Sequence, residues 1–122
     1  MRIERIETIR LRVPWGPPEL NERRDWIIVR VHTDDGLVGM ARGGDADIIA
    51  SELQPLLLGQ DATSISYHWQ RMYEEVWRFR GPGRAAMESI GAIDVALWDL
   101  LGQSCGMPVW RLLGGHRSVV PV

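Results

Sequence analysis

The chain has 122 residues, which is enough for one compact domain and too few for two. Its composition, with 45% hydrophobic and 25% charged residues, is typical of a soluble globular domain, and no apolar run approaches the roughly 20 residues that span a bilayer. The net charge is −2 and the arginines are interleaved with acidic residues, which argues against the basic surface of a nucleic-acid-binding protein.

The lysine and cysteine content restricts the catalytic chemistry and the disulfides that this chain can have. All 14 basic residues are arginines, so these residues offer no lysine for base or Schiff-base catalysis. The chain has one cysteine, Cys105, which excludes an intramolecular disulfide and fits a reducing compartment. Its charged first residues lack the apolar stretch of a signal peptide. We therefore expect a cytoplasmic protein that binds neither a membrane nor a nucleic acid.

The first element predicted along the chain is a strand over residues 3–13. Apolar Ile9, Leu11 and Val13 alternate there with charged residues, which indicates a strand with one buried face. Prolines and a glycine follow directly and stop the pattern. We expect a loop over residues 14–25.

Two further strands follow this loop. Residues 26–33 are rich in β-branched and aromatic side chains, and residues 37–41 form a second apolar run. The Asp35-Gly36 pair between them is among the strongest short signals for a hairpin. The sequence therefore predicts a three-stranded antiparallel meander.

The spacing of apolar residues then changes to that of helices. Asp45 or Asp47 can cap a helix over residues 48–56, which Pro55 bends or ends. A second helix follows Thr63 or Ser64 as its cap. Its apolar stripe consists of Ile65, Trp69, Met72, Tyr73 and Val76.

The third predicted helix, over residues 85–101, is apolar around nearly its whole circumference, which requires burial on more than one side. Gly102 and Gly106 are expected to end it. A short helix over residues 108–113 follows, with Pro108 as its first residue. Residues 118–122 are expected to open another strand.

Three segments together resemble the mandelate racemase and muconate lactonizing branch of the enolase superfamily. They are VRVHTDDGLVG at residues 29–39, SIGAIDVALWDL at 89–100 and GMPVWRLLGG at 106–115, followed by Arg117 and VPV at 120–122. Their order and spacing also match, and the likeness runs from residue 1 to residue 122.

The resemblance implies an α+β fold in which three strands are followed by three or four helices. Residues 1–117 would be the N-terminal capping domain, and residues 118–122 would begin the first strand of a TIM barrel that is otherwise absent. The family abstracts a proton next to a substrate carboxylate, using Mg²⁺ bound by barrel residues. The parent enzyme would be a lyase or an isomerase, whereas these 122 residues alone would be inactive. Family members are commonly oligomers, so the resemblance also implies a homo-oligomer.

The residues themselves suggest no catalytic or metal site. Asp94 and Asp99 fall about 140° apart around a helix, so they do not form one metal-binding face. The three histidines share no metal-ligand spacing with any acidic residue. We therefore predict no catalytic residue and no metal ligand in this chain, and hydrogen bonding as the role of the two aspartates.

The resemblance also implies candidate substrate-binding residues. In the family, the loops after the first and third strands close over the barrel mouth, and here they correspond to residues 14–25 and 42–45. Arg23, Arg24 and Arg42 lie in these loops and could bind a carboxylate through two parallel hydrogen bonds, while Trp15 offers an apolar wall. The alternative is that the arginines are solvated and that Trp15 packs on the sheet.

The substrate class and the reaction are less constrained. The RFRGPGR segment at residues 78–84 is similar to an arginine-glycine turn of the family's acid-sugar dehydratases, which favours an acid sugar as the substrate class. The alternative is a turn between helices whose glycines allow the bend. The family's Gly-x-Gly-Glu after the third strand is replaced by Gly39-Met40-Ala41-Arg42. Dehydratase, racemase and cycloisomerase all stay open, as does a stand-alone binding module without catalytic activity.

Overall fold

The chain folds into a three-stranded antiparallel sheet followed by four helical segments, as the predicted α+β class requires. The computed structural model describes residues 1–79, 81 and 83–121. The elements are β1 (Ile3–Trp15), the 3₁₀ turn η1 (Pro18–Leu20), β2 (Glu22–Thr33), β3 (Val38–Arg42), α1 (Ala46–Ile48), η2 (Ile49–Leu53), α2 (Gln54–Leu57), α3 (Ile65–Phe79), α4 (Arg84–Cys105) and α5 (Val109–Leu112).

The hairpin of β1 and β2 is longer than predicted. Pairing continues to Trp15 opposite Glu22, so the expected loop over residues 14–25 is wrong, and only residues 16–21 connect the strands. Proline at position 14 misled the prediction: β1 is an edge strand, where the missing N–H of a proline is tolerated.

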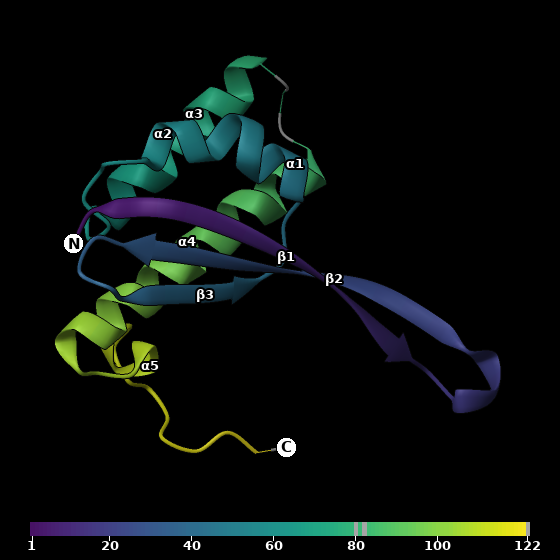
Figure 1. The fold of residues 1–122 in the computed structure, drawn as a ribbon. Helices are drawn as coiled ribbons and strands as arrows, with labels where there is room; N and C mark the ends of the chain where they lie inside the picture. Colours follow the sequence, from purple (N-terminus) through teal and green to yellow (C-terminus); the bar gives the residue numbers. More distant parts are fainter. Residues whose placement is uncertain (80, 82, 122) are drawn as a thin grey trace.

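Because β3 is short, the far part of this hairpin has no third strand beside it. β3 pairs with β2 only from Ile28 to His32. Figure 1 shows the remaining part of β1 and β2 projecting from the helices as a two-stranded ribbon, which we call the arm. A two-stranded ribbon has little stability of its own, so side-chain contacts between β1 and β2 are needed to stabilise the arm.

The core face of the sheet is not the one that the alternation in β1 suggests. Val29 and Val31 of β2 are buried, and Ile6 of β1 lies opposite Val31 on the same face. Ile9 lies opposite Ile28 on the other face, with Leu11, which is 44% exposed. The alternation itself is therefore correct, but the stripe of Ile9, Leu11 and Val13 faces away from the helices.

Helix α4 forms the centre of the core. Figure 1 shows it crossing behind β2 and β3. Its buried residues are Ala86, Ser89, Ile90, Ala92, Ile93, Ala96, Leu97, Leu100 and Gly102. The sheet approaches α4 most closely at Gly39, where an added Cβ would overlap the Ala96 carbonyl oxygen and lie 2.7 Å from Leu100 Cγ. The helix is covered on most sides, and Val95 remains 55% exposed.

The segment from α1 to α2 confirms one predicted cap. The Asp45 carboxylate accepts hydrogen bonds from the Asp47 and Ile48 N–H groups at 3.0 and 3.1 Å. The segment then widens into a π-helical turn in η2 and returns to α-helix at Gln54. Pro55 does not end the helix, because it lies in the first turn of α2, where a missing N–H is tolerated.

Helix α3 buries the predicted apolar stripe. Ile65, Met72 and Val76 are buried, and Trp69 stacks on Tyr73 with ring centroids 5.2 Å apart. The role of His68 was not apparent from the sequence. Its side chain is 1% exposed, and Nε2 donates to the Asp61 carbonyl oxygen at 2.7 Å.

The end of α4 differs from the prediction at one glycine. Gly106 ends the helix in a left-handed conformation, but Gly102 lies inside it and is buried. A Cβ on Gly102 would meet the Met107 carbonyl oxygen at 2.8 Å, so this glycine lets the chain fold back into α5.

The tail after α5 carries no regular element as far as the structure describes it. Residues 118–121 are not in a strand, and Val122 lies outside the described residues. The division between residues 117 and 118 stays a prediction. Within the described part of the chain, no helix is long and apolar enough to cross a membrane.

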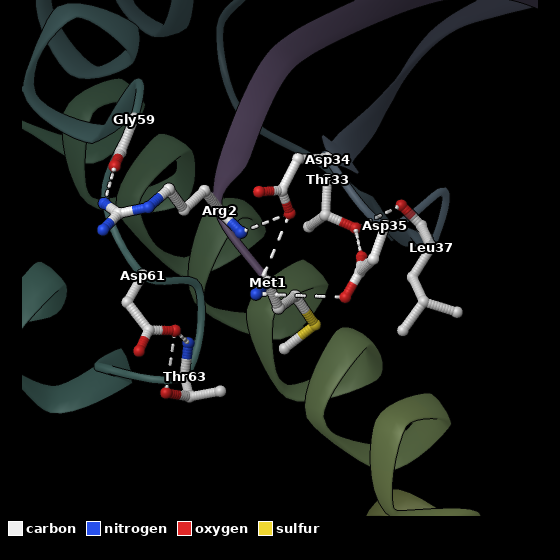
Figure 2. A network of polar contacts seen from close by, with 9 residues as sticks. All are labelled: Met1, Arg2, Thr33, Asp34, Asp35, Leu37, Gly59, Asp61 and Thr63. Carbon is white, nitrogen blue, oxygen red and sulfur yellow. Dashed lines mark hydrogen bonds and ion pairs between the residues drawn. The ribbon is translucent and has the colours of Figure 1, made fainter.

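Polar contacts hold the N-terminus against two loops, as Figure 2 shows. The Arg2 N–H donates to Asp34 Oδ1, and the Arg2 guanidinium donates to the Gly59 carbonyl oxygen, both at 2.8 Å. The terminal amino group lies 3.8 Å from Asp34 and 3.9 Å from Asp35. These contacts fix the start of β1 at the end of the domain opposite the arm.

Two carboxyl groups of this network have lowered pKa values. The Thr33 hydroxyl donates to Asp35 at 2.5 Å and is the main cause of the lowered pKa of Asp35. The Thr63 N–H and hydroxyl donate to Asp61 Oδ1 at 3.0 and 2.9 Å and likewise lower the pKa of Asp61. Both carboxylates are therefore stabilised in their charged form by folding.

Stability should fall in acid because of these groups and of Glu7, whose pKa is lowered chiefly by its hydrogen bond with His32. A pKa that folding lowers contributes stability above the unfolded value, and this contribution is lost as the pH falls through the folded value. The free energy of unfolding should decrease below about pH 4, measured by urea denaturation across pH. A variant with Glu7→Gln, Asp35→Asn and Asp61→Asn should be less stable at pH 7 and show a flatter decrease.

Glu19→Gln provides the control for this experiment. Glu19 lies in η1, and the described residues give it no hydrogen bond or ion pair. This variant should follow the unmodified chain at every pH. A triple variant that loses stability in acid as steeply as the unmodified chain would contradict the assignment.

Candidate functional site

A pocket of about 410 Å³ lies between the arm, the end of β3 and the start of α4. This volume is within the range of small-molecule sites. Three arginines and two tryptophans dominate its lining. The lining residues are Trp15, Arg24, Asp25, Trp26, Ile27, Arg42, Gly43, Gly44, Arg84 and Glu88.

Two of the arginines are held against indole rings. The Arg24 guanidinium lies 4.2 Å from the centre of the Trp15 ring, and the Arg42 guanidinium lies 4.5 Å from the centre of the Trp26 ring. Strand geometry explains the first pair: Trp15 lies opposite Glu22, and Arg24 is two residues along β2 on the same face. Contact with the indole face orients each guanidinium. Its N–H groups lie in the plane of the guanidinium and remain available to a ligand.

The structure brings three of the four predicted substrate-binding residues together and separates the fourth. Trp15, Arg24 and Arg42 line the pocket. Arg23 lines a different pocket of about 230 Å³ at the tip of the arm. Arg23 and Arg24 are successive strand residues, so their side chains leave opposite faces of the strand. Trp15 lines both pockets.

The remaining charges of the pocket are already paired. Arg84 and Glu88, one turn apart on α4, form an ion pair at 2.6 Å, and this hydrogen bond raises the pKa of Arg84. Asp25 accepts from Arg12 at 3.2 Å and lies 3.7 Å from Arg10. Sequence analysis had placed Arg84 only in a basic turn and had not singled out Glu88 or Asp25.

Arg42 is positioned by a tight loop between β3 and α1. The Gly43 N–H donates to the Ile27 carbonyl oxygen at 2.9 Å, and Gly44 adopts a φ of 83° against α4. A Cβ on Gly44 would lie 3.0 Å from the Ser89 Cα. The Ser89 hydroxyl accepts from the Asp45 N–H at 2.8 Å and donates to the Ala85 carbonyl oxygen at 2.7 Å.

Removing this hydroxyl should loosen the loop. Ser89 is fully buried, so Ser89→Ala leaves the Asp45 N–H without its partner and should cost about 2 kcal/mol of unfolding free energy. Ser104→Ala is the matched control, because Ser104 is exposed on the same helix and its hydroxyl contacts only near neighbours among the described residues, the Leu101 carbonyl oxygen at 2.9 Å and Cys105 Sγ at 3.9 Å. Thermal unfolding of both variants tests this, and equal stability of the two would contradict the bridging role.

The described residues do not fit a magnesium ion. They contain no group of three or more His, Cys, Asp or Glu side chains that could hold a metal. Asp99 instead accepts from the Met40 N–H at 2.9 Å and from Gln103 at 3.1 Å, which is the structural role predicted for it. Asp94 is half-buried, and desolvation raises its pKa.

The RFRGPGR segment can be followed only in part. Arg80 and Pro82 lie outside the described residues, so its likeness to the dehydratase turn stays a prediction. Arg84 at its end lines the pocket. The pocket can therefore bind anions and pack against flat or apolar groups. Its lining, as far as the structure describes it, includes no serine, cysteine, lysine or histidine, and its two carboxylates, Asp25 and Glu88, are paired with arginines.

Comparison with protein families gives one match that covers most of the chain. The profile of the mandelate racemase/muconate lactonizing enzyme N-terminal domain matches residues 19–114. A D-galactonate dehydratase family member from Paenibacillus sp. (strain JDR-2) is 44% identical over 106 residues, which cover 79% of this chain and 25% of that protein.

Two further comparisons cover nearly the whole chain. A 3,6-anhydro-alpha-L-galactonate cycloisomerase from Streptomyces coelicolor is 36% identical and is matched over 98% of this chain and 37% of its own length. The crystal structure of a racemase from Streptomyces coelicolor A3(2) with bound magnesium superposes with a TM-score of 0.86 at 34% identity, over 98% of this chain and 37% of that chain. The chain thus spans between 25% and 37% of the length of these proteins.

Proposed function

The chain belongs to the mandelate racemase/muconate lactonizing enzyme family as its N-terminal domain, and from this premise we propose that it caps the substrate site of an acid-sugar enzyme. Relatives named as a galactonate dehydratase family member and an anhydrogalactonate cycloisomerase support an acid sugar as the substrate. Both names denote sugar carboxylates, and the arginines of the pocket are suited to carboxylates.

The chemistry itself belongs to the remainder of the enzyme. In enolase-superfamily sites, Mg²⁺ stabilises the charge that develops at the substrate carboxylate after proton abstraction. The family places the metal ligands and the base on a C-terminal barrel, which would be the domain partner of this cap. The described residues of this chain contribute binding groups and the exclusion of water.

One observation carries this proposal: Arg24 of the arm and Arg42 at the end of β3 line the same pocket, and the guanidinium of each lies over an indole ring. Neither has a carboxylate partner among the described residues. Because a guanidinium donates two parallel hydrogen bonds to a carboxylate, the pocket is prepared for an anionic substrate.

The proposal can be tested by fusing residues 1–117 to the barrel of the Paenibacillus relative. The isolated 122-residue chain should convert no acid sugar with Mg²⁺, whereas the fusion should convert at least one member of an acid-sugar panel. Replacing both Arg24 and Arg42 by glutamine should lower kcat/KM at least tenfold, because each loses a charge-assisted hydrogen bond.

The fold of the fusion must be verified by circular dichroism, and the unmodified relative serves as the positive control. A folded, active fusion whose kcat/KM is unchanged by the double substitution would contradict the role of the pocket. Conversion by the isolated chain would contradict the assignment as a cap. A folded fusion that binds acid sugars but converts none would favour a binding module instead.

A further inference from the structure

The charge balance of the pocket leaves two cations available. Arg84 is neutralised by Glu88, and Asp25 is neutralised by Arg12 and Arg10. Arg24 and Arg42 make no ion pair with the described residues. The pocket therefore presents two unneutralised guanidinium groups to whatever enters it.

These two groups are held separately. Arg24 rests on Trp15 of β1, whereas Arg42 rests on Trp26 of β2. Each indole restricts one side chain and covers one face of its guanidinium, so binding in the plane costs less conformational entropy. A neutral hydroxyl end of a sugar would gain little from these charges, whereas a carboxylate would accept charge-assisted hydrogen bonds from a guanidinium.

The proposed function places the metal ligands on the other domain, where Mg²⁺ would hold the carboxylate next to the reacting carbon. The arginines of this cap must then face the end of the substrate remote from the reaction. We propose, on the basis of that function, that the pocket formed by Arg24 and Arg42 binds a second carboxylate and thus selects sugar diacids over monoacids of the same length.

The proposal can be tested on the 122-residue chain itself, through the indole N–H signals of Trp15 and Trp26 in proton–nitrogen NMR spectra. Variants Trp15→Phe and Trp26→Phe assign the two signals. Galactonate and its diacid galactarate share a carbon chain and differ only at one end, so they form a matched pair. Both are titrated at constant ionic strength.

Galactarate should shift both indole signals with a dissociation constant at least tenfold lower than that of galactonate. Arg24→Gln and Arg42→Gln should each weaken galactarate binding about tenfold, the expected effect of losing one charge-assisted hydrogen bond. Arg111→Gln is the matched control, because Arg111 also lies over an indole, 5.2 Å from the ring of Trp110, but belongs to α5. Its effect should stay within twofold.

Equal affinities for the two acids would overturn the selection of diacids while leaving the capping function to the fusion experiment. An equal loss in the Arg111→Gln variant would show that only net charge matters, which would also overturn the proposal. The same holds if neither acid shifts the indole signals of Trp15 and Trp26. An inactive fusion, in contrast, would overturn the proposed function itself.

Discussion

Replacing Gly39 by alanine is expected to lower the free energy of unfolding by about 3 kcal/mol, at the upper end of the cost of overpacking. The added Cβ would overlap the Ala96 carbonyl oxygen and crowd Leu100 Cγ at 2.7 Å. The first of these is backbone of a buried helix and cannot rotate away, so β3 and α4 would have to separate. Urea denaturation followed by circular dichroism measures the loss.

Gly91→Ala is the matched control for this substitution. Gly91 lies in α4, and a Cβ there would meet nothing within 4 Å. Alanine is the better helix former, so this change should raise stability by about 0.5 to 1 kcal/mol. If Gly39→Ala were as stable as Gly91→Ala, the close approach of β3 to α4 would be incorrect.

Leu97→Ala should cost a similar amount, about 3 kcal/mol within a usual range of about 2 to 5 kcal/mol. Leu97 is fully buried in the core that α4 shares with the sheet and the other helices. The truncation removes apolar contacts and leaves a cavity that its neighbours can fill only partly. Against a total stability of roughly 5 to 15 kcal/mol, this is a large fraction.

Val95→Ala distinguishes burial from a general sensitivity of the helix. Val95 lies two residues from Leu97 on the same helix but is 55% exposed. Its truncation should change the free energy of unfolding by no more than about 0.5 kcal/mol. Denaturation curves for the two variants should therefore separate clearly, and coincident midpoints would refute the orientation of α4.

The candidate site was only partly predictable from the sequence. Trp15, Arg24 and Arg42 were expected to bind substrate because they fall in loops that resemble those of the family, and they line one pocket. Their loop assignment was wrong for all three, because they lie in paired strands. Arg23 was expected to bind substrate because it falls in the same expected loop, but it lines a second pocket, to which Trp15 also contributes.

Long-range partners could not be predicted at all. Glu88 neutralises Arg84, and the Ser89 hydroxyl bonds the Asp45 N–H, 44 positions away. No local pattern indicates which helical residue will meet which loop, because this depends on how α4 lies across the sheet. A buried serine within an apolar helix was the one available signal, and it does not identify its partner.

The sequence by itself determined the order and type of the elements and the family to which the chain belongs. Apolar periodicity, helix caps and turn residues act over a few positions, so they can be recognised in the sequence without knowledge of the tertiary structure. Only the tertiary structure decided which face of β1 is buried, how far the arm extends, and which arginines share a pocket. Those outcomes depend on strand register, and a shift of one residue would turn every side chain of a strand to the opposite face.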